Sequence, residues 1–367
     1  MRPLLITGGA GFIGANFVRQ WRESHPDDPI VVLDALTYAG SRASLDGVAE
    51  VKFILGDIGD QALVERLLAD FRIHTVVHFA AETHVDRSIL DPDAFLQANV
   101  LGTHILLKAA KAVWLDAQSG QPHRFHHVST DEVYGSLAPE DPPAAETAPY
   151  APNSPYAASK AGADHLVRAY GRTFGLETTM SHASNNFGPF QHPEKLIPLT
   201  LVGALEGRPL PIYGDGLNVR DWLGVADHCR AIELILEGAK PGARFNIGGG
   251  SPLTNLALVE RLCAALDRAF AADPALAARF PTAPAARGAK ASRLIRHVAD
   301  RPGHDRRYAI DDTAIRARLD YAPTGDLDSL LAETVDWYLN NEAWWRSMLA
   351  RGLGSAPRAG TGMGGSL

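Results

Sequence analysis

The chain has 367 residues, of which 46 % are hydrophobic and 21 % are charged, and these proportions are ordinary for a globular protein with a sizeable core. The 35 basic and 42 acidic residues give a formal net charge of −7, which does not favour nucleic acid as a partner. No apolar run reaches the roughly 18 residues of a membrane span, and the apolar run that soon follows Met1 argues against a signal peptide.

The first element of the chain predicts dinucleotide binding. Residues 4–6 form a short apolar run, typical of a buried parallel strand, which leads through a Gly-rich turn into a helical pattern. Glycine at every third position permits a tight turn, a close approach of the backbone to a pyrophosphate, and close packing of helix against strand. The helix N-terminus then faces the phosphates. The residues expected at this cofactor site are Gly8, Gly11, Phe12, Ile13 and Gly14.

Carboxylates follow the second and third predicted strands. Residues 30–33 form the second apolar run, and Asp34 follows it at the spacing of the dinucleotide fingerprint. A carboxylate there accepts hydrogen bonds from ribose hydroxyls and repels a 2′-phosphate, so NAD is favoured over NADP; the alternative is a solvated acid in a turn. Residues 51–55 form the third strand. The acid Asp57 and the aliphatic Ile58 after it suit the edge and the face of an adenine ring. The further cofactor candidates are Leu36, Thr37, Asp57 and Ile58.

The next elements continue the alternation of strands and helices. A helical pattern over 61–70 precedes a strand over 75–79, and small residues at the exit of that strand leave room for a cofactor. A long helix is predicted over 99–112 and a fifth strand over 125–128. This alternation predicts an α/β protein with a doubly wound parallel sheet. The cofactor candidates in this stretch are Ala80, Ala81, Thr83 and Asn99.

Metal ligation is not predicted. His84 and Asp86 are possible ligands by residue type, but no third ligand stands at a suitable spacing. Cys229 and Cys263 are the only cysteines, and two are too few for a disulfide framework or a cysteine metal set. Both lie in helical patterns and are expected to be buried free thiols, which fits a reducing cytoplasm.

Two adjacent acids follow the fifth strand. Thr130, Asp131 and Glu132 stand just past its carboxyl end, the edge at which open α/β sheets bind ligands. Adjacent carboxyl groups can serve as proton donor and proton acceptor. The alternative is that both acids only face the dipole at a helix N-terminus.

Tyr156 and Lys160 are the other candidate catalytic residues. They stand four apart on a helix that opens after Pro155, so their side chains share one face. An ammonium beside a phenol favours the phenolate and lowers the pKa of the phenol. We therefore expect Tyr156 to act as a base near neutral pH, although Tyr-x-x-x-Lys also occurs in helices by chance.

Regular alternation of strands and helices fades in the second half of the chain, which predicts a smaller substrate-binding part interleaved with the sheet. The expected elements are a helix to 174, strands over 177–181, 210–213 and 245–248, an irregular break at 185–189, a helix from 192 to 206, an extended segment over 219–225 and a helix over 256–270. Residues 271–292 are expected to be irregular. The predicted domains are 1–184 for NAD and 185–350 for the substrate, followed by a disordered tail over 351–367.

Several long motifs resemble a known family. The Gly-rich turn with Tyr156 and Lys160 resembles the extended short-chain dehydrogenase/reductase superfamily. Within it, longer strings resemble the dTDP-glucose 4,6-dehydratases, and the resemblance runs from about residue 2 to about residue 345. These strings cover residues 80–88, 126–135, 185–198, 220–223 and 300–308.

The resemblance implies a reaction and a role for each candidate. The expected activity is dehydration of dTDP-glucose to dTDP-4-dehydro-6-deoxyglucose with bound NAD. Tyr156 removes the 4-hydroxyl proton, Lys160 holds the nicotinamide ribose, Glu132 removes the C5 proton, and protonated Asp131 donates to the departing C6 hydroxyl. Thr130 and Thr83 hydrogen-bond the sugar, and the family is usually dimeric through the region of residues 99–112 and 157–170.

The family resemblance also implies residues that bind the nucleotide sugar and its cofactor. Arg220, Lys195 and His304 are the candidates for the pyrophosphate, and strand 211–213 is expected to meet the base. The complete set of further site residues is Asn185, Asn186 (cofactor), Leu196, Pro211, Ile212, Tyr213, Asn255, Asp300 and Arg301. The chain departs from the family pattern at Ala35, Ala98, Gly224 and residues 250–252.

Other functions share part of this pattern. A nucleotide-sugar 4-epimerase shares the glycines, Tyr156 and Lys160, but it needs neither Asp131 nor Glu132, because no C5 proton and no C6 hydroxyl are removed. A 4,6-dehydratase of another nucleoside diphosphate sugar shares all of them. A catalytically inactive NAD-binding sensor is the alternative from a different class, and the intact acids and Tyr–Lys pair argue against it.

Overall fold

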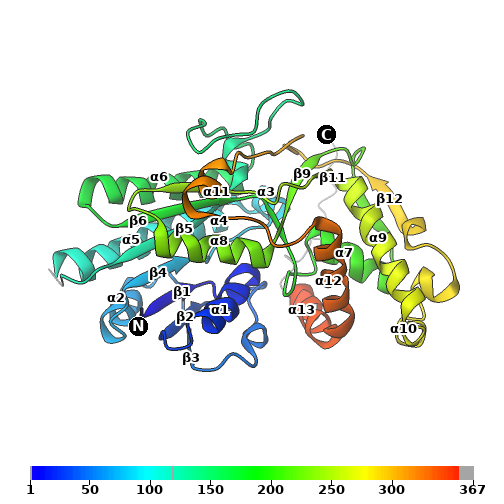
Figure 1. Ribbon diagram of the computed structural model, residues 1–367, viewed down its shortest axis with the longest axis horizontal. Helices are drawn as coiled ribbons and strands as arrows, with labels where there is room; N and C mark the ends of the chain where they lie inside the picture. Colours follow the sequence, from blue (N-terminus) through cyan, green and yellow to red (C-terminus); the bar gives the residue numbers. More distant parts are fainter. Residues whose placement is uncertain (1, 118–119, 355–367) are drawn as a thin grey trace, which may run out of the picture.

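A seven-stranded parallel sheet forms the centre of the molecule (Figure 1). The computed structural model describes residues 2–117 and 120–354. The strand order is β10-β6-β5-β4-β1-β2-β3, and every neighbouring pair runs parallel. These strands are β1 (Leu4–Thr7), β2 (Ile30–Asp34), β3 (Val51–Leu55), β4 (Thr75–His78), β5 (Arg124–Thr130), β6 (Thr178–Ala183) and β10 (Arg244–Ile247).

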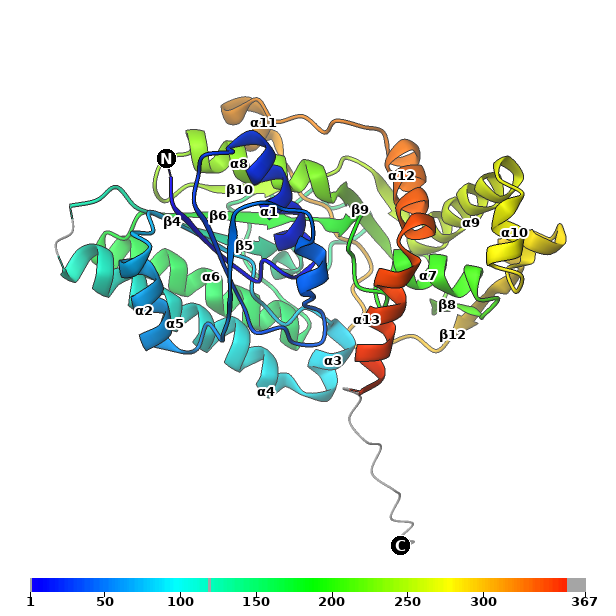
Figure 2. The same ribbon diagram turned by 90° about the horizontal axis from the view of Figure 1, so that it is seen from below.

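Helices cover both faces of this sheet (Figure 2), which explains why its central strands are continuous apolar runs without alternation. On one face, α1 (Phe12–Ser24) and α8 (Val225–Gly238) pack together over residues such as Phe17 and Ile232. On the other face, α2 (Gln61–Asp70), α5 (Thr103–Lys111) and α6 (Pro155–Phe174) bury Leu67, Leu107 and Val167. The predicted doubly wound α/β fold is therefore confirmed.

The helix predicted over 99–112 begins earlier and is less regular than expected. It consists of α4 (Pro92–Phe95), the π-helical segment Leu96–Gly102, α5, and a second π-helical segment, Ala112–Asp116. The start was missed because Asp91 is the N-cap, accepting from Ala94 N at 3.4 Å, and Pro92 occupies the first helical position. A short helix, α3 (Val85–Leu90), precedes it.

The second half of the chain builds a smaller layer at one end of the sheet (Figures 1 and 2). It contains a three-stranded sheet in the order β11-β9-β7 and a parallel pair, β8 and β12. The strands are β7 (Asn185–Phe187), β8 (Leu210–Tyr213), β9 (Val219–Gly224), β11 (Pro252–Thr254) and β12 (Ile295–Val298). The helices are α7 (Leu196–Leu205), α9 (Asn255–Ala272), α10 (Ala275–Arg279), α12 (Leu327–Asn340) and α13 (Glu342–Gly354), whereas α11 (Thr313–Leu319) packs on β10 and α8.

The stretch 271–292 is more ordered than predicted. It contains α10 and the 3₁₀ turn Pro284–Arg287, because Leu276 and Phe280 are buried in the core of this layer. Helix α13 continues to Gly354, so residues 351–354 of the predicted tail are helical, and the rest of that prediction lies outside the described residues. None of the described helices is long and apolar enough to cross a membrane.

Candidate active site

A cleft of about 680 Å³ opens at the carboxyl ends of the parallel strands. Its lining combines the turns after β1 to β4 with the end of β5, with α6 and with residues 191–195 of the second layer, whereas the turn after β5 does not line it. The predicted residues that line it are Gly8, Gly11, Phe12, Ile13, Gly14, Asp34, Thr37, Asp57, Ile58, Ala80, Ala81, Thr83, Tyr156, Lys160 and Lys195. Topology thus gathers residues far apart in sequence at one edge of the sheet, as expected for an open α/β sheet.

The Gly-rich turn has space for backbone but not for side chains. Gly8 has φ +71°, and a Cβ there lies 2.6 Å from Ala80 N. At Gly14 a Cβ lies 2.3 Å from Gly8 O. Helix α1 starts at N-cap Gly11, which supplies no side-chain cap for the first backbone N–H groups. These uncapped donors beside the cleft fit a pyrophosphate.

Asp34 is buried, not solvated, with 8 % of its surface exposed. Its carboxylate accepts hydrogen bonds from Ala10 N at 2.9 Å and Leu36 N at 2.8 Å, which fixes its direction at the cleft. Burial raises its pKa, and these two backbone bonds oppose the rise. Leu36 adopts φ +50° and contributes this backbone N–H without lining the cleft.

Two further predicted cofactor residues, Asn99 and Asn186, do not line the cleft either. Asn99 is buried on the helix before α5, where it bonds both backbone groups of Glu82 and donates to Ser159 Oγ at 2.8 Å. Asn186 Oδ1 faces His228 Nδ1 at 2.8 Å. These hydrogen bonds therefore stabilise the walls of the cleft, and neither asparagine side chain lines it.

Tyr156 and Lys160 enter the cleft from the first turns of α6. Ser154 caps this helix by accepting from Ala157 N at 3.1 Å, and Pro155 occupies its first position. Lys160 Nζ donates to Val128 O at 2.8 Å, and burial lowers the pKa of Lys160 to about 8. Both side chains are almost completely buried.

The surroundings of Tyr156 do not lower its pKa as predicted. Burial raises the pKa of this phenol, and the charge of Glu132 raises it further. The prediction was wrong because it took account only of Lys160, the neighbour on the same helix, whose ammonium donates to a backbone carbonyl. It left out Glu132, whose negative charge acts on the phenol from another element.

Asp131 and Glu132 differ in their surroundings. They form a 3₁₀ turn directly after β5, and Thr130 Oγ1 accepts from Glu132 N at 3.2 Å and donates to Asp131 Oδ1 at 3.3 Å. Asp131 is 2 % exposed, and burial together with Glu132 raises its pKa far above the ordinary value. Burial also raises the pKa of Glu132, but three cations oppose that rise, namely Arg220, Arg301 and Lys195. The pair therefore holds a proton on Asp131 in preference to Glu132.

Arg220 and Lys195 are two of the cations whose charge acts on Glu132. Arg220 is 5 % exposed, so it is not a solvated surface residue; it donates to Val219 O and Asp305 O and lies 4.2 Å above the Tyr308 ring. Lys195 Nζ donates to Thr83 O at 3.0 Å, which joins the second layer to the turn after β4.

A polar cluster joins other predicted substrate residues around Asp86. Its carboxylate accepts from Tyr213 Oη and from Arg301 Nη1, each at 3.0 Å. His304 Nδ1 lies 2.6 Å from Asp300 Oδ1, and its ring meets Tyr213 edge-on. Asp86 was predicted only as a possible metal ligand, and its partners in this cluster lie more than 120 residues away in the chain, where no local pattern indicates them.

The remaining predicted substrate residues have mixed positions. Asn185 Oδ1 and Asn255 Oδ1 are buried without a hydrogen-bond partner among the described residues. Leu196 and Ile212 pack on the core of the second layer, and Pro211 is exposed on β8. At Gly224, a Cβ lies 3.0 Å from Leu330 Cδ1, so the packing of α12 explains a small residue there.

Several cleft residues were not predicted as site residues. Ser129 lies at the end of β5 and Glu82 in the turn after β4, whereas the loop before α7 reaches the cleft only through the packing of the second layer. The loop residues are Gln191, His192 and Glu194. Ala98 also lines the cleft.

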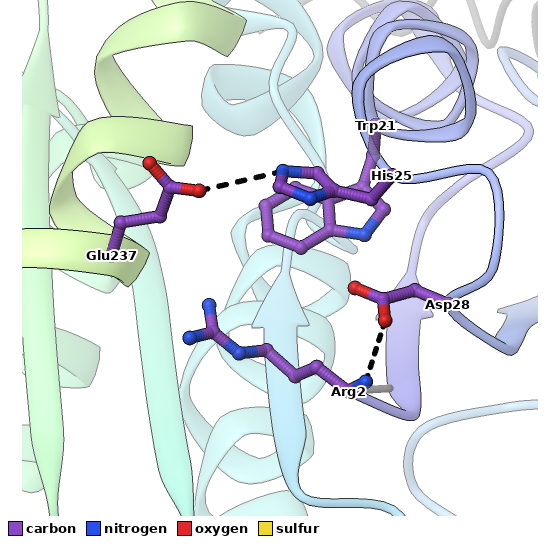
Figure 3. Close-up of a pocket in the computed structure, with 5 residues that line it drawn as sticks. All are labelled: Arg2, Trp21, His25, Asp28 and Glu237. Carbon is purple, nitrogen blue, oxygen red and sulfur yellow. Dashed lines mark hydrogen bonds and ion pairs between the residues drawn. The ribbon is translucent and has the colours of Figure 1, made fainter.

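A second, smaller pocket lies away from this cleft, where the end of α1 meets the end of α8 (Figure 3). His25 stacks on Trp21 and pairs with Glu233 at 2.9 Å and Glu237 at 3.6 Å. His25, Glu233 and Glu237 are the one group within the described residues whose histidine and acid side chains are close enough to share a metal ion. Because the histidine and acids already pair with one another, we interpret the pocket as a junction between the helices.

The fold and cleft define a Rossmann-type dinucleotide-binding class. Tyr156 and Lys160 line the cleft, and Asp131 and Glu132 form the turn after β5 at the same edge of the sheet without lining it. The family model for GDP-mannose 4,6 dehydratase matches residues 5–334. A dTDP-glucose 4,6-dehydratase from Neisseria meningitidis is 47 % identical and covers 99 % of this chain and 100 % of its own length. One from Xanthomonas campestris is 49 % identical, with 95 % and 96 % covered.

A solved structure extends the similarity to three dimensions. The dTDP-glucose 4,6-dehydratase of Streptomyces venezuelae, crystallised with NAD, is 46 % identical, has a TM-score of 0.83, and covers 94 % of this chain and 99 % of its own. The chain therefore belongs to the family described by the GDP-mannose 4,6 dehydratase model and, within it, to the group of the dTDP-glucose 4,6-dehydratases.

Proposed function

We propose that this protein is an NAD-dependent dTDP-glucose 4,6-dehydratase that forms dTDP-4-dehydro-6-deoxyglucose and water. The observation that carries the proposal is the unequal pair of acids beside Tyr156. Asp131 is buried and retains its proton, whereas Glu132 faces three cations that favour its carboxylate. An oxidation at C4 alone needs no such pair, but an elimination across C5 and C6 needs an acid and a base together.

NAD fits the cleft through groups of this chain. The Gly-rich turn and the start of α1 would hold the pyrophosphate, Asp34 the adenosine ribose, and Asp57 with Ile58 the adenine. Bound there, NAD supplies a temporary hydride acceptor, so the overall dehydration has no net redox change. The orientation of Asp34 by two backbone N–H groups supports a preference for NAD over NADP.

Tyr156 acts as the base that takes the proton of the 4-hydroxyl. Its ring lies in the cleft wall on α6, and Lys160 occupies the same wall one turn later. Lys160 contributes its positive charge and hydrogen-bonds the nicotinamide ribose. Thr130 and Thr83 hydrogen-bond the sugar from the end of β5 and from the turn after β4.

Glu132 then removes the C5 proton, which the 4-ketone has made acidic, and Asp131 donates its proton to the departing C6 hydroxyl. The proton arrangement before elimination is thus the one that the surroundings of the pair favour. Arg220, Lys195 and His304 would bind the pyrophosphate of the nucleotide, and β8 would meet its base.

These roles assign different binding functions to the two halves of the chain. Residues 1–184 mainly bind NAD, and residues 185–350 mainly bind the nucleotide sugar, although β10 and α8 of the later part complete the first. We place the protein in the cytoplasm, since Cys229 and Cys263 are both free and buried.

We also propose a homodimer through the helices between α3 and α6. Large apolar side chains are exposed there, including Leu90 at 78 %, Leu96 at 50 % and Leu101 at 47 %. Replacing Leu96 and Leu101 together with Lys should halve the mass measured by light scattering without changing the fold. A wild-type chain that is already monomeric at micromolar concentration would contradict the dimer.

Product analysis tests the proposed reaction. The purified protein is incubated with dTDP-glucose in deuterated water, and the product is examined by mass spectrometry and NMR. We expect loss of one water, a C4 ketone, a C6 methyl group and deuterium at C5. A 4-epimerase instead gives dTDP-galactose without deuterium at C5, and UDP-glucose and GDP-mannose, offered in parallel, test the nucleotide.

A further inference from the structure

Asp164 is a buried acid that the proposed mechanism does not use. It stands one turn after Lys160 on α6, so both side chains lie on the same face of that helix, and 1 % of its surface is exposed. Its Oδ2 atom accepts from Ser129 Oγ at 3.0 Å and Tyr150 Oη at 2.9 Å, and it lies 3.0 Å from His182 Nε2. Its Oδ1 atom lies 3.2 Å from His127 Nε2.

These neighbours keep Asp164 ionised. A buried carboxylate costs several kcal/mol unless polar groups surround it, and four side chains do so here. The pKa of Asp164 is held far below its ordinary value by His127 and His182. Burial lowers the pKa of His127 to about 4, so this histidine stays neutral at neutral pH and does not itself neutralise the charge of Asp164.

Lys160 needs such a charge. Its ammonium is buried and bonds a neutral carbonyl, Val128 O, and the described residues place no carboxylate within 4.0 Å of its nitrogen. Burial alone favours loss of its proton, and Asp164 is the acid that opposes this. The negative charge also disfavours the phenolate of Tyr156.

We propose that Asp164 is a positioning residue whose fixed negative charge, held by His127, His182, Tyr150 and Ser129, keeps the Lys160 ammonium protonated beside Tyr156. The catalytic part of this inference rests on the proposed dehydratase function. Other titratable or charged groups that face this region are His78 on β4, Tyr134 after β5, His165 on α6, Arg244 on β10, and the acids Asp131 and Glu132.

Asp164→Asn tests the proposal, because it keeps the shape and removes the charge. Titration of Lys160 is followed by NMR of protein labelled at the lysine ε-carbon, with its signal assigned by its absence in Lys160→Arg. We expect the midpoint to fall by about one pH unit. The profile of kcat against pH for dTDP-glucose should move to lower pH on both limbs, because Asp164 raises the pKa of Lys160 and of Tyr156 alike.

Asp227→Asn is the matched control. Asp227 is also 1 % exposed and accepts two hydrogen bonds from Thr324, but it lies on α8. This variant should lose stability without moving the lysine midpoint or the pH profile. If Asp164→Asn does not fold, Asp164→Leu serves, since it has a similar branched shape and no charge.

An unchanged lysine midpoint in a folded Asp164 variant overturns the proposal, even if kcat falls, because a purely structural role lowers kcat equally at every pH. The NMR titration needs no turnover. It therefore still tests the charge effect if dTDP-glucose proves not to be the substrate, and failure of the two ideas can be told apart.

Discussion

Replacing Glu132 with Gln should stop elimination while leaving C4 oxidation possible. The substitution keeps the shape of the side chain and removes the base that takes the C5 proton. A positioned general base typically accelerates a reaction by roughly 100- to 10,000-fold, so we expect kcat to fall by that factor, or about 3–5 kcal/mol in barrier.

The structure predicts a second effect of the same change. The charge of Glu132 raises the pKa of Tyr156 and of Asp131, so its removal makes the phenol easier to ionise and the acid easier to deprotonate. The first half-reaction should therefore proceed at least as readily as in the wild type. Rapid mixing with dTDP-glucose should show the absorbance of reduced nicotinamide rising and persisting.

Asp131→Asn is the matched comparison, because it is also isosteric and affects the neighbouring acid. It should slow departure of the C6 hydroxyl but still allow exchange of the C5 proton with deuterated water, which Glu132→Gln should not. Release of keto sugar by Glu132→Gln at more than a tenth of the wild-type rate would refute the assignment of the base.

Three further predictions follow from the geometry of the cleft and its surroundings. Gly8→Ala should cost about 2–4 kcal/mol of unfolding free energy in urea, because a Cβ meets Ala80 N at 2.6 Å, whereas Gly175→Ala, with φ +78° and open space, should cost only about 1 kcal/mol. Asp34→Asn should weaken NAD about tenfold in calorimetry and narrow the preference over NADP, since the charge that repels a 2′-phosphate is lost. The free energy of unfolding should fall as the pH is lowered from about 6.5 towards 4, because burial lowers the pKa of His228 to about 3 and this histidine is therefore protonated first in the unfolded chain. His228 contributes up to about 1.4 kcal/mol per pH unit to this loss of stability. His228→Gln should reduce the slope of unfolding free energy against pH by that amount.

The parallel sheet could be predicted closely because its strands are short apolar runs that end at Gly, Asp or small residues. Such runs mark strands buried on both faces, and their alternation with helices fixes a parallel topology. Helix α4 was missed since its start depends on a cap at Asp91, not on apolar periodicity. The 3₁₀ and helical turns within 271–292 depend on burial of Leu276 and Phe280, which composition does not indicate.

The cleft lining was predicted best where residues directly follow strands. Gly8, Asp34, Asp57 and Ala80 all stand at strand exits, and topology alone places them at one edge. Residues contributed by distant loops were harder to predict. The Asp86 cluster unites residues from α3, from β8 and from the stretch after β12, and no local pattern relates them.

The Tyr156 pKa shows why a motif alone does not define chemistry. Tyr-x-x-x-Lys fixes two groups on one helix, but the charge that most affects the phenol belongs to Glu132 on another element. Like charges this close disfavour ionisation of both groups at once. While Tyr156 is a phenolate, Glu132 is therefore held towards its protonated form; once Tyr156 has taken the 4-hydroxyl proton, the ring is neutral and the Glu132 carboxylate is favoured. Completion of the first proton transfer therefore removes a charge that opposes ionisation of Glu132, so the pKa of the C5 base is lower in the step that needs the base.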